Sequence, residues 1–359
     1  MRKFILLSLV FLTSFTAFSQ DFSNKGKDFW VGYGYHTIMQ PGNGNLQEMV
    51  LYFATDQVTN ITISIASTGY TQNITTPAGN NVTTSFAIPK AGAQDARLFT
   101  EGLSSNGIHI TSDKPMVAYA HIYNGNCSGA TILYPTNTLG KEYYSINYKN
   151  WSNQNNANGW FYVVATDTGT TTVEITPQAD QAGVVTNGGW VAGTTYTVSL
   201  TQGQIYNVMG VLTGGGPPPG NNPFKGVDLT GSKVKSINTG NGCKRIGVFS
   251  GSGRISITCN ANSSSSDNYM VQAAPKTAWG KKYLTTPALG IIDATHPEGN
   301  QAVNIFRVCV ADPLTVVRVN GVVTVLPLQN NFYYEIPQTN LPQMIEGDQP
   351  IMVAQYFTS

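Results

Sequence analysis

The sequence predicts an all-β protein made of tandem antiparallel β-sandwich-like repeats. A short motif of glycine, lysine, a charged residue and an aromatic residue, which we call the GK motif, occurs three times, as Gly26–Phe29, Gly140–Tyr143 and Gly280–Tyr283. Apolar and polar residues alternate with a period of two along much of the chain, and no window shows helical periodicity. Turn signals recur about every ten residues, which favours sandwiches of six or seven short strands.

The three GK motifs divide the chain into a leader, residues 1–20, and repeat units at residues 21–139, 140–279 and 280–359. A motif that recurs at the start of each unit indicates a repeat architecture. The chain stops where the earlier units still have strands to come, so we expect the third unit to be truncated or a reduced cap. A propeller-like or fused arrangement is the alternative, because repeated hairpins also build blades.

Each unit repeats one order of strands and turns. A first strand ends at an aspartate, Asp56, Asp167 or Asp312, and a second strand returns. Turns with a proline, Ser112–Pro115 and Gly347–Pro350, are predicted before a later strand of the first and third units. The main predicted strands are Met49–Ala54, Ile61–Ile65, Val82–Ile88 and Met116–Ala120; then Trp160–Ala165, Thr172–Ile175, Thr195–Leu200 and Ile246–Phe249; then Ile305–Val310, Val316–Val319, Phe332–Ile336 and Ile351–Ala354.

The first twenty residues have the pattern of a secretory signal peptide. Arg2 and Lys3 form a basic start, an apolar run follows, and Ala17 and Ser19 supply the small residues that a signal peptidase reads. The apolar run is shorter than the roughly 20 residues that span a bilayer. We therefore predict an exported protein, extracellular or at the cell surface, with no transmembrane segment in the mature chain.

Charge argues against a nucleic-acid partner. Two of the 20 lysines and arginines lie in the leader, so the mature chain carries 18 basic and 19 acidic side chains. A general nucleic-acid binder would show a clustered basic face. The mature chain also exceeds what one hydrophobic core usually serves, so two or three domains are expected.

The recurring aspartates Asp56, Asp167 and Asp312 are interpreted as structural. Aspartate accepts local backbone N–H groups in turns, and one active site would need only one copy. A glycoside hydrolase needs two carboxylates at a set separation, and nothing in the sequence pairs these. We therefore predict no catalytic residue.

Two of the four cysteines suggest a disulfide. Cys243 and Cys259 flank a predicted hairpin turn at Ser250–Ser252, and residues directly opposed across a symmetric hairpin are within disulfide range. Closing a loop of about 17 residues would contribute roughly 3 kcal/mol. Cys309 lies among alternating apolar residues and is expected to be a buried thiol. Pairing of Cys127 with Cys309 would require the first and third units to touch.

The histidines do not define a metal site. His36 and His296 are isolated, whereas His109 and His121 flank the Lys114–Pro115 turn and would meet across a hairpin. Two ligands without a third make a weak metal site, and the chain has no CxxC motif. No phosphate loop or nucleophile elbow is present either. We predict no metal and no cofactor.

Trp151 is the candidate binding residue. Most aromatic residues of the second unit are expected in the sandwich core, but Trp151 lies in a predicted loop among polar neighbours. Loops on rigid β scaffolds often carry recognition, and an aromatic ring supplies a large rigid contact area. The polar neighbours are Asn150, Ser152, Asn153, Asn155 and Asn156.

Several ordered motifs resemble the IgG Fc-binding protein N-terminal domain family. The resemblance runs from about Lys25 onward and rests on Gly26–Val31, Ser112–Pro115, Asp228–Val234, Gly247–Gly251 and Gln272–Tyr283. It implies an exported surface protein, of a kind that often carries further adhesive modules. Where the family commonly has a Cys-Asp-His stretch, this chain has Ser266–Asn268, which implies that a family disulfide is missing or rewired.

Together these features predict an exported cell-surface or secreted binding or adhesion protein. It would recognise an extracellular protein or glycan through loops on its β repeats, and it is not expected to be an enzyme. A structural spacer within a larger surface protein is the alternative. A carbohydrate-active hydrolase is disfavoured by the missing pair of acids. The family label does not fix the ligand, immunoglobulin included.

Overall fold

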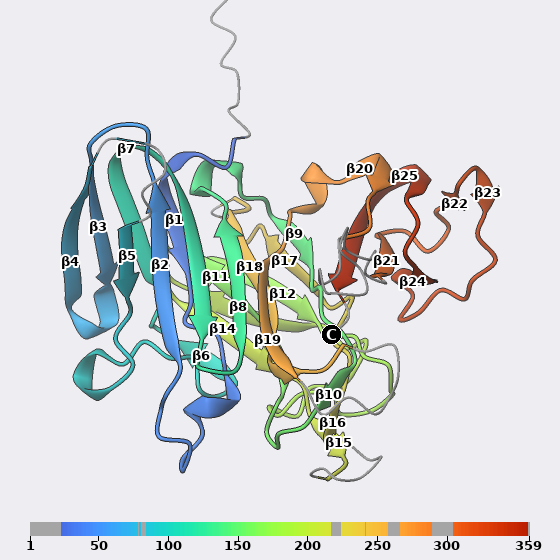
Figure 1. The fold of residues 1–359 in the computed structure, drawn as a ribbon, viewed down its shortest axis with the longest axis horizontal. Coiled ribbons are helices and arrows are strands. Elements are labelled where there is room, and N and C mark those ends of the chain that lie inside the picture. The colour runs from blue at the N-terminus through green and yellow to red at the C-terminus, as the bar shows by residue number, and fades with distance from the viewer. Residues whose placement is uncertain are drawn as a thin grey trace, which may run out of the picture.

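The computed structural model describes residues 23–77, 79, 84–216, 224–240, 242–257, 266–288 and 304–357, and the predicted leader lies outside these ranges. The regular structure in the described ranges consists of β-strands and five 3₁₀ helices of three residues each (Figure 1). All the ladders between named strands are antiparallel, so the predicted all-β class is confirmed. The 3₁₀ helices are η1 (Thr37–Met39), η2 (Ala66–Thr68), η3 (Gly92–Gln94), η4 (Thr136–Thr138) and η5 (Lys276–Ala278).

The first unit is a sandwich whose two sheets share one long strand, β7. The first half of β7 pairs with β1 and β3, and its second half pairs with β2 and β8. β4 extends the first sheet and β5 the second. The strands are β1 (Gly26–Val31), β2 (Glu48–Ala54), β3 (Thr59–Ile65), β4 (Tyr70–Thr76), β5 (Thr84–Ala87), β7 (Ile108–Tyr123) and β8 (Ser128–Leu133).

The second unit repeats this arrangement with the long strand divided in two. One sheet has the order β13-β12-β17-β9, and the other has the order β19-β18-β11-β14-β6. A separate small sheet has the order β10-β16-β15. The strands are β6 (Gly102–Ser104), β9 (Glu142–Tyr144), β10 (Asn150–Ser152), β11 (Gly159–Ala165), β12 (Thr171–Thr176), β13 (Tyr196–Leu200), β14 (Ile205–Met209), β15 (Leu212–Gly214), β16 (Phe224–Gly226), β17 (Lys233–Ile237), β18 (Ile246–Ile255) and β19 (Asp267–Gln272).

The third unit repeats it again around the long strand β25. The order is β23-β22-β25-β21-β24, with β20 also paired to β25. The strands β1, β9 and β20, which carry the GK motifs, thus occupy one position in three copies of the scheme. The strands are β20 (Gly280–Thr285), β21 (Asn304–Val310), β22 (Val317–Val319), β23 (Val322–Val323), β24 (Tyr333–Thr339) and β25 (Gln343–Phe357). The sandwich-like repeats are confirmed, whereas the unit boundaries after residues 139 and 279 stay a prediction.

The turns predicted at Ser112–Pro115 and Gly347–Pro350 are wrong, because both segments lie inside long strands. Opposite β1 the register jumps from Met116 to Thr111, and opposite β20 it jumps from Ile351 to Glu346. Each segment is therefore a bulge at which the strand leaves one sheet and enters the other. Proline has no N–H to donate, so it is tolerated where the ladder is interrupted.

The residues of the GK motif divide between surface and interior. Lys27, Lys141 and Lys281 are exposed, whereas Phe29 and Tyr143 are fully buried and Tyr283 is half-buried. The Tyr143 hydroxyl accepts a hydrogen bond from the Gly140 N–H at 2.7 Å, and the third GK motif repeats this bond. The aromatic residue of the motif therefore fixes the chain where each sandwich begins.

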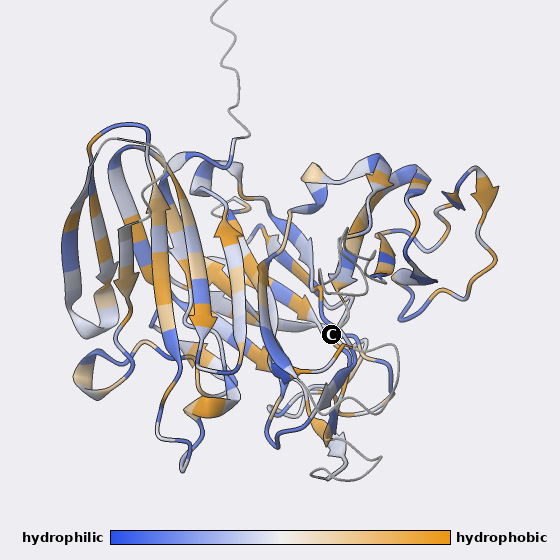
Figure 2. Cartoon of the chain, in the orientation of Figure 1, coloured by the Kyte–Doolittle hydropathy of each residue, from blue (hydrophilic) through white to orange (hydrophobic). Residues whose placement is uncertain are grey.

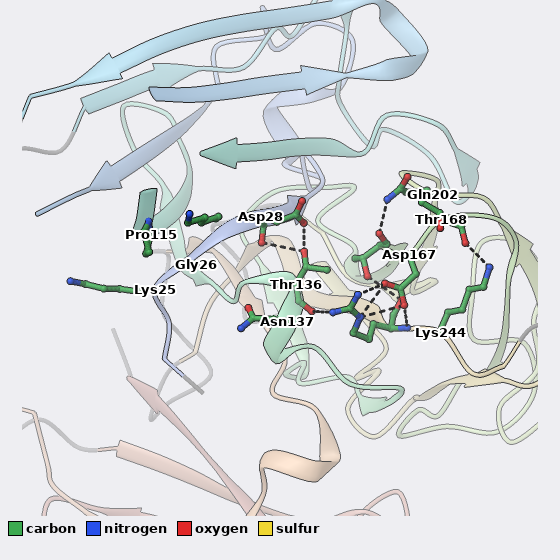
Figure 3. A pocket seen from close by; sticks show the side chains of 13 residues that line it. Lys25, Gly26, Asp28, Pro115, Thr136, Asn137, Asp167, Thr168, Gln202 and Lys244 are labelled. Carbon is green, nitrogen blue, oxygen red and sulfur yellow. Dashed lines mark hydrogen bonds and ion pairs between the residues drawn. The ribbon is translucent and has the colours of Figure 1, made fainter. Parts of the chain in front are cut away.

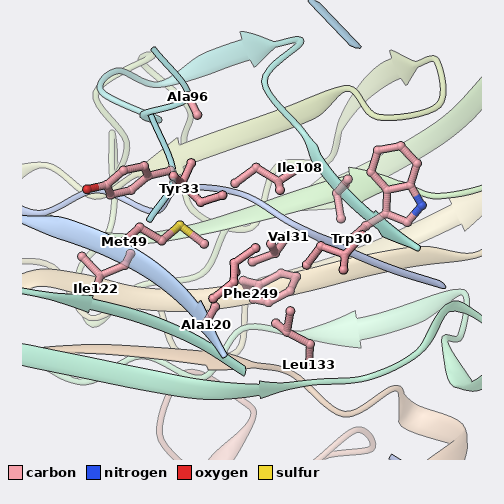
Figure 4. Packing of buried hydrophobic residues seen from close by; sticks show 14 of the residues in the cluster. Trp30, Val31, Tyr33, Met49, Ala96, Ile108, Ala120, Ile122, Leu133 and Phe249 are labelled. Atoms are coloured by element: carbon pink, nitrogen blue, oxygen red, sulfur yellow. The ribbon is translucent and has the colours of Figure 1, made fainter. Parts of the chain in front are cut away.

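The three sandwiches are fused through shared sheets. Apolar residues alternate with polar ones along many strands, and β11 and β21 are buried along their whole length (Figure 2). One face of β11, with Trp160 and Tyr162, packs into the core of the first unit. Phe249 lies in the same core, among residues such as Val31 and Leu133 (Figure 4). Its other face, with Phe161 and Val163, packs in the second unit. One sheet therefore serves two cores, so the sandwich-like repeats are fused to each other.

We call these contacts the first and second seams. The first seam is the packing of Trp160, Tyr162 and Phe249 on the first unit. The second seam joins the second and third units through a cluster that includes Tyr144 and Phe332, together with Arg307, Tyr148 and Tyr333. None of the described helices is long and apolar enough to cross a membrane.

Candidate functional site

One cavity contains residues of the first GK motif, and another contains Trp151. We call the first the GK pocket, because the first GK motif lines it (Figure 3). Its volume is about 790 Å³. Its lining consists of Lys25, Gly26, Lys27, Asp28, Pro115, Thr136, Asn137, Thr166, Asp167, Thr168, Gln202, Lys244 and Arg245.

Most charges of the GK pocket are compensated within the protein. Arg245 Nη2 lies 2.6 Å from Asp167 Oδ1, and Lys244 Nζ donates to the Thr168 carbonyl at 2.5 Å. Lys25 pairs with Asp56. Since these cations already have partners, the pocket has the character of a structural junction.

Asp28 shows how this junction is held together. Its carboxylate lies 2.8 Å from His109 Nε2 and accepts a hydrogen bond from the Thr136 hydroxyl. Burial raises the pKa of Asp28, but the hydrogen bonds from His109 and Thr136 outweigh it and lower the pKa overall. Asp28 therefore links the first GK motif to η4 as an ionised group.

The second cavity contains Trp151, and we call it the Trp151 pocket. It has a volume of about 320 Å³. It opens at the second seam, between elements of the second and third units. Its lining consists of Tyr148, Lys149, Trp151, Asp180, Asp228, Ser256, Arg307, Gln329, Tyr333 and Glu335.

Trp151 lies on a short strand, so its predicted position in a loop is wrong. β10 pairs with β16, which places Trp151 opposite Lys225. The flanking Asn150 donates to the Ala157 carbonyl and accepts from the Ser252 hydroxyl at 3.0 Å. Asn150 therefore anchors a strand, and the half-buried Trp151 lines the cavity.

Arg307 forms a rigid wall of the Trp151 pocket. Its side chain is 3% exposed, and Nη1 lies 2.7 Å from Oδ2 of Asp228, which is 2% exposed. Nε donates to Glu335 at 2.9 Å, and Nη1 donates to the Thr230 hydroxyl at 2.8 Å. A buried charge requires partners of this kind, because desolvation costs several kcal/mol for each ion.

Two tyrosine rings lie close to the guanidinium. Its Cζ atom lies 4.2 Å from the ring centroids of both Tyr148 and Tyr333. Burial alone would lower the pKa of Arg307, but Asp228 and the neighbouring tyrosine and glutamate side chains raise it overall. The guanidinium therefore stays charged, and its stacked rings are fixed in the pocket wall.

Two polar groups of the Trp151 pocket have no hydrogen-bond partner among the described residues, namely Trp151 Nε1 and Ser256 Oγ. Both residues line the same cavity, and the Ser256 N–H donates to the Trp151 carbonyl at 2.6 Å. Buried polar side chains in native structures nearly always find a partner. Both atoms are buried, and both residues contribute to the lining of the cavity.

The predicted Cys243–Cys259 disulfide rests on a hairpin that does not exist. Residues Ser250–Ser252 lie in the middle of β18, which pairs with β19. The backbone is extended at these residues and makes no turn, because β18 pairs with β11 on one side and with β19 on the other. Cys243 forms no disulfide with a described cysteine, and Cys259 lies outside the described residues, so the pairing itself stays a prediction.

Cys309 is a fully buried thiol, as predicted, and burial raises its pKa to about 12. The expected approach of His109 and His121 is wrong, because both lie on the single strand β7. His109 stacks on Trp30, whereas His121 stacks on Tyr123. Within the part of the chain that the structure describes, no group of three histidine, cysteine or acidic side chains is placed to hold a metal ion.

Sequence reasoning missed most of the Trp151 pocket. Arg307, Asp228 and Tyr333 come from separate parts of the chain, and only the fold brings them together. One signal was available: Arg307 is the only charged residue in the apolar run Ile305–Val310. A charged residue in a strand whose pattern predicts full burial indicates that a partner of opposite charge is buried beside it.

The fold and the two cavities define a β-sandwich repeat protein with an aromatic pocket at a seam between repeats. More specifically, the chain belongs to a family whose model is described as IgGFc binding protein, which matches residues 129–359. The matched segment contains all the residues that line the Trp151 pocket. No curated protein and no solved structure matches the chain.

Proposed function

We propose that this chain is an exported extracellular binding protein and that its ligand is a protein. The family description, which names binding to the Fc part of an immunoglobulin, supports a protein ligand. The leader pattern in residues 1–20 supports export. Attachment to the cell surface and a role in adhesion belong to the same proposal.

The Trp151 pocket is the proposed recognition site. The observation that carries this assignment is that Trp151 Nε1 and Ser256 Oγ, whose residues line one cavity, have no hydrogen-bond partner in the described part of the chain. Arg307 and its partners keep the wall in place without a ligand, which lowers the cost of ordering the site on binding. A cavity of about 320 Å³ suits one side chain of a protein ligand.

The same geometry supports binding without catalysis. Three carboxylates line the pocket: Asp228 and Glu335 are both bonded to Arg307, and Asp180 lies 3.9 Å from Lys149 Nζ. A general acid and a general base must be available to the substrate, and paired groups of opposite charge are not. We therefore propose that the protein is not an enzyme.

An array of extracellular proteins and glycans, probed with the purified chain, identifies the ligand. The proposal expects a saturable protein ligand. If only glycans bind, the ligand is a glycan and the proposed protein ligand is wrong. If nothing binds, the structural spacer is favoured.

The Trp151→Ala variant then tests the site. Removing a tryptophan at the centre of an interface typically costs about 2 kcal/mol or more, so the affinity should fall about 30-fold or further. Trp190→Ala is the matched control, because Trp190 is a half-buried tryptophan of the same unit that stacks on Tyr196 and Tyr206. Unchanged affinity in folded Trp151→Ala protein would remove the assignment.

Export has its own test. Expression of the full chain in a bacterial host, followed by sequencing of the mature N-terminus, should find a protein that begins at Gln20 or Asp21. A cytoplasmic product that retains Met1 would contradict export without affecting the pocket.

A further inference from the structure

The last strand of the first two units occupies a position that no described strand fills in the third. In the first unit β8 pairs with the second half of β7, from Ala118↔Leu133 to Tyr123↔Ser128. In the second unit β19 pairs with β18 in the same place. In the third unit the second half of β25 pairs with β21 on one side, and no described strand pairs with its other side.

A cavity of about 740 Å³ lies at this position beside the second half of β25. One wall consists of β19 residues Asp267–Val271, and the other consists of Ala354–Phe357 at the end of β25. The rest of the lining includes the apolar side chains of Ile146, Ile255 and Ile257. A groove between two strands, with an apolar floor, has the shape of a missing strand.

The first seam shows how such a strand would lie. There β8 runs beside β19, and hydrogen bonds between backbone N–H groups and side-chain oxygens connect the two segments. The Gln272 N–H donates to the Thr131 hydroxyl at 2.9 Å, and the Tyr134 N–H donates to Gln272 Oε1 at 2.7 Å. The third unit follows the second as the second follows the first. A strand paired to β25 would therefore lie beside β19 as β19 lies beside β8, and this position is the groove.

We propose that this groove accepts an extended segment of a partner protein, which adds to β25 as an antiparallel strand. The edge of β25 that no described strand pairs offers its backbone N–H and C=O groups, and β-strand addition uses such groups for affinity. The groove floor selects apolar side chains at alternate positions. The partner segment therefore resembles β8 and β19, which are both six residues long and run toward a proline.

A free segment fits the groove better than a second copy of the same edge. In each copy, β25 is itself one wall of the groove, with β21 beside it and β19 across the gap. Two such walls cannot enter each other's grooves at the same time. An extended peptide has no such restriction, and it would cover Phe357, which is 60% exposed.

The test uses a fluorescent peptide with the sequence of residues 267–275, titrated into the purified chain and followed by fluorescence anisotropy. Saturable binding at least tenfold tighter than that of a scrambled peptide is expected. The same peptide with Met270→Pro should lose binding at least tenfold, because proline removes a ladder donor. Equal binding of the native and scrambled peptides, or no binding at all, would overturn the proposal.

Two variants of the protein locate the interaction. Phe357→Glu places a charge in the groove and should weaken peptide binding at least tenfold. Leu284→Glu is the matched control, because Leu284 is 76% exposed on β20 and does not line the cavity. Binding that is insensitive to Phe357→Glu, or equally weakened by both variants, would also overturn the proposal. Neither variant touches the Trp151 pocket, so the two proposals fail independently.

Discussion

The two seams are built on the same strand scheme and filled with different chemistry. At the first seam, aromatic and aliphatic side chains such as Trp160, Tyr162 and Phe249 form one continuous apolar core with the first unit. At the second seam, apolar packing is joined by the buried pair of Arg307 and Asp228. The Trp151 pocket, in which Trp151 Nε1 and Ser256 Oγ have no partner among the residues that the structure describes, is at the second seam.

This difference indicates that the two seams have different roles. An apolar seam gains stability from burial and leaves little polar chemistry for a ligand. A seam that contains a buried ion pair gains less net stability, because desolvation offsets much of the attraction, but it fixes charged and aromatic groups in defined positions. The first seam therefore holds the repeats together, and the second combines that task with the proposed recognition site.

Truncation at the first seam should have the largest effect on stability. Trp160 is fully buried, its indole N–H donates to the Tyr35 carbonyl at 2.9 Å, and its ring stacks on Tyr162. Trp160→Ala should lower the free energy of unfolding by about 3–5 kcal/mol, as measured by urea denaturation. The half-buried Trp190→Ala is the control with the smaller loss, and equal losses would contradict the apolar seam's role.

Removing one partner of the ion pair should cost nearly as much at the second seam. Arg307→Met leaves Asp228 buried without its cation, which typically costs about 3–5 kcal/mol. The double variant Arg307→Met with Asp228→Asn should recover much of that loss, because no uncompensated charge remains. Urea denaturation of the single and double variants measures the coupling. Additive losses would show that the two residues do not act as a pair.

Acid should weaken the first seam through His36. Burial, with a smaller contribution from Arg254, lowers the pKa of His36 to about 4. The unfolded chain binds this proton below about pH 6.5 and the folded chain only below about pH 4, so stability falls as the pH drops through that window. The full loss is about 3 kcal/mol.

The His36→Gln variant isolates this contribution. Denaturation at a series of pH values should show a shallower dependence between about pH 6.5 and 4 in the variant than in the wild type. His121→Gln is the comparison at a less buried histidine. An unchanged slope in His36→Gln would assign the acid sensitivity to other groups.

The tyrosine hydroxyls of the GK motifs should give the smallest effect. Tyr143→Phe removes the acceptor for the Gly140 N–H and should cost about 1 kcal/mol, the usual net value of one hydrogen bond. Tyr283→Phe should behave similarly in the third unit. The first unit already has Phe29 at this position, so the substitution is compatible with the fold. Thermal denaturation measures the difference, and a loss above that of Trp160→Ala would reverse the proposed ranking.

The sequence predicts the repeat better than it predicts the turns inside it. Three GK motifs and alternating strands suffice for the sandwich class, because these patterns are local. Pro115 and Pro350 suggest turns, yet long-range pairing absorbs each into a bulge. Ser250–Ser252 looks like a hairpin turn, but glycine and serine also pack well in a strand that is buried on both faces.

The candidate site, too, can be predicted from the sequence only in part. Trp151 is identified from its neighbours in the sequence, whereas its pocket depends on Arg307, Asp228 and Tyr333, which the fold brings together. No local pattern connects residues so far apart in the chain. Besides Trp151, the single charge inside the apolar run Ile305–Val310 is the signal in the sequence that points to this pocket.

The central claim is that the second seam is the recognition site. Hydrogen–deuterium exchange of the chain, with and without the protein ligand found on the array, tests it most directly. We expect slower exchange on binding at residues 148–151 and 329–335, with little change around the GK pocket at residues 25–28 and 244–245. Protection confined to the GK pocket, with none around Trp151, would contradict the account.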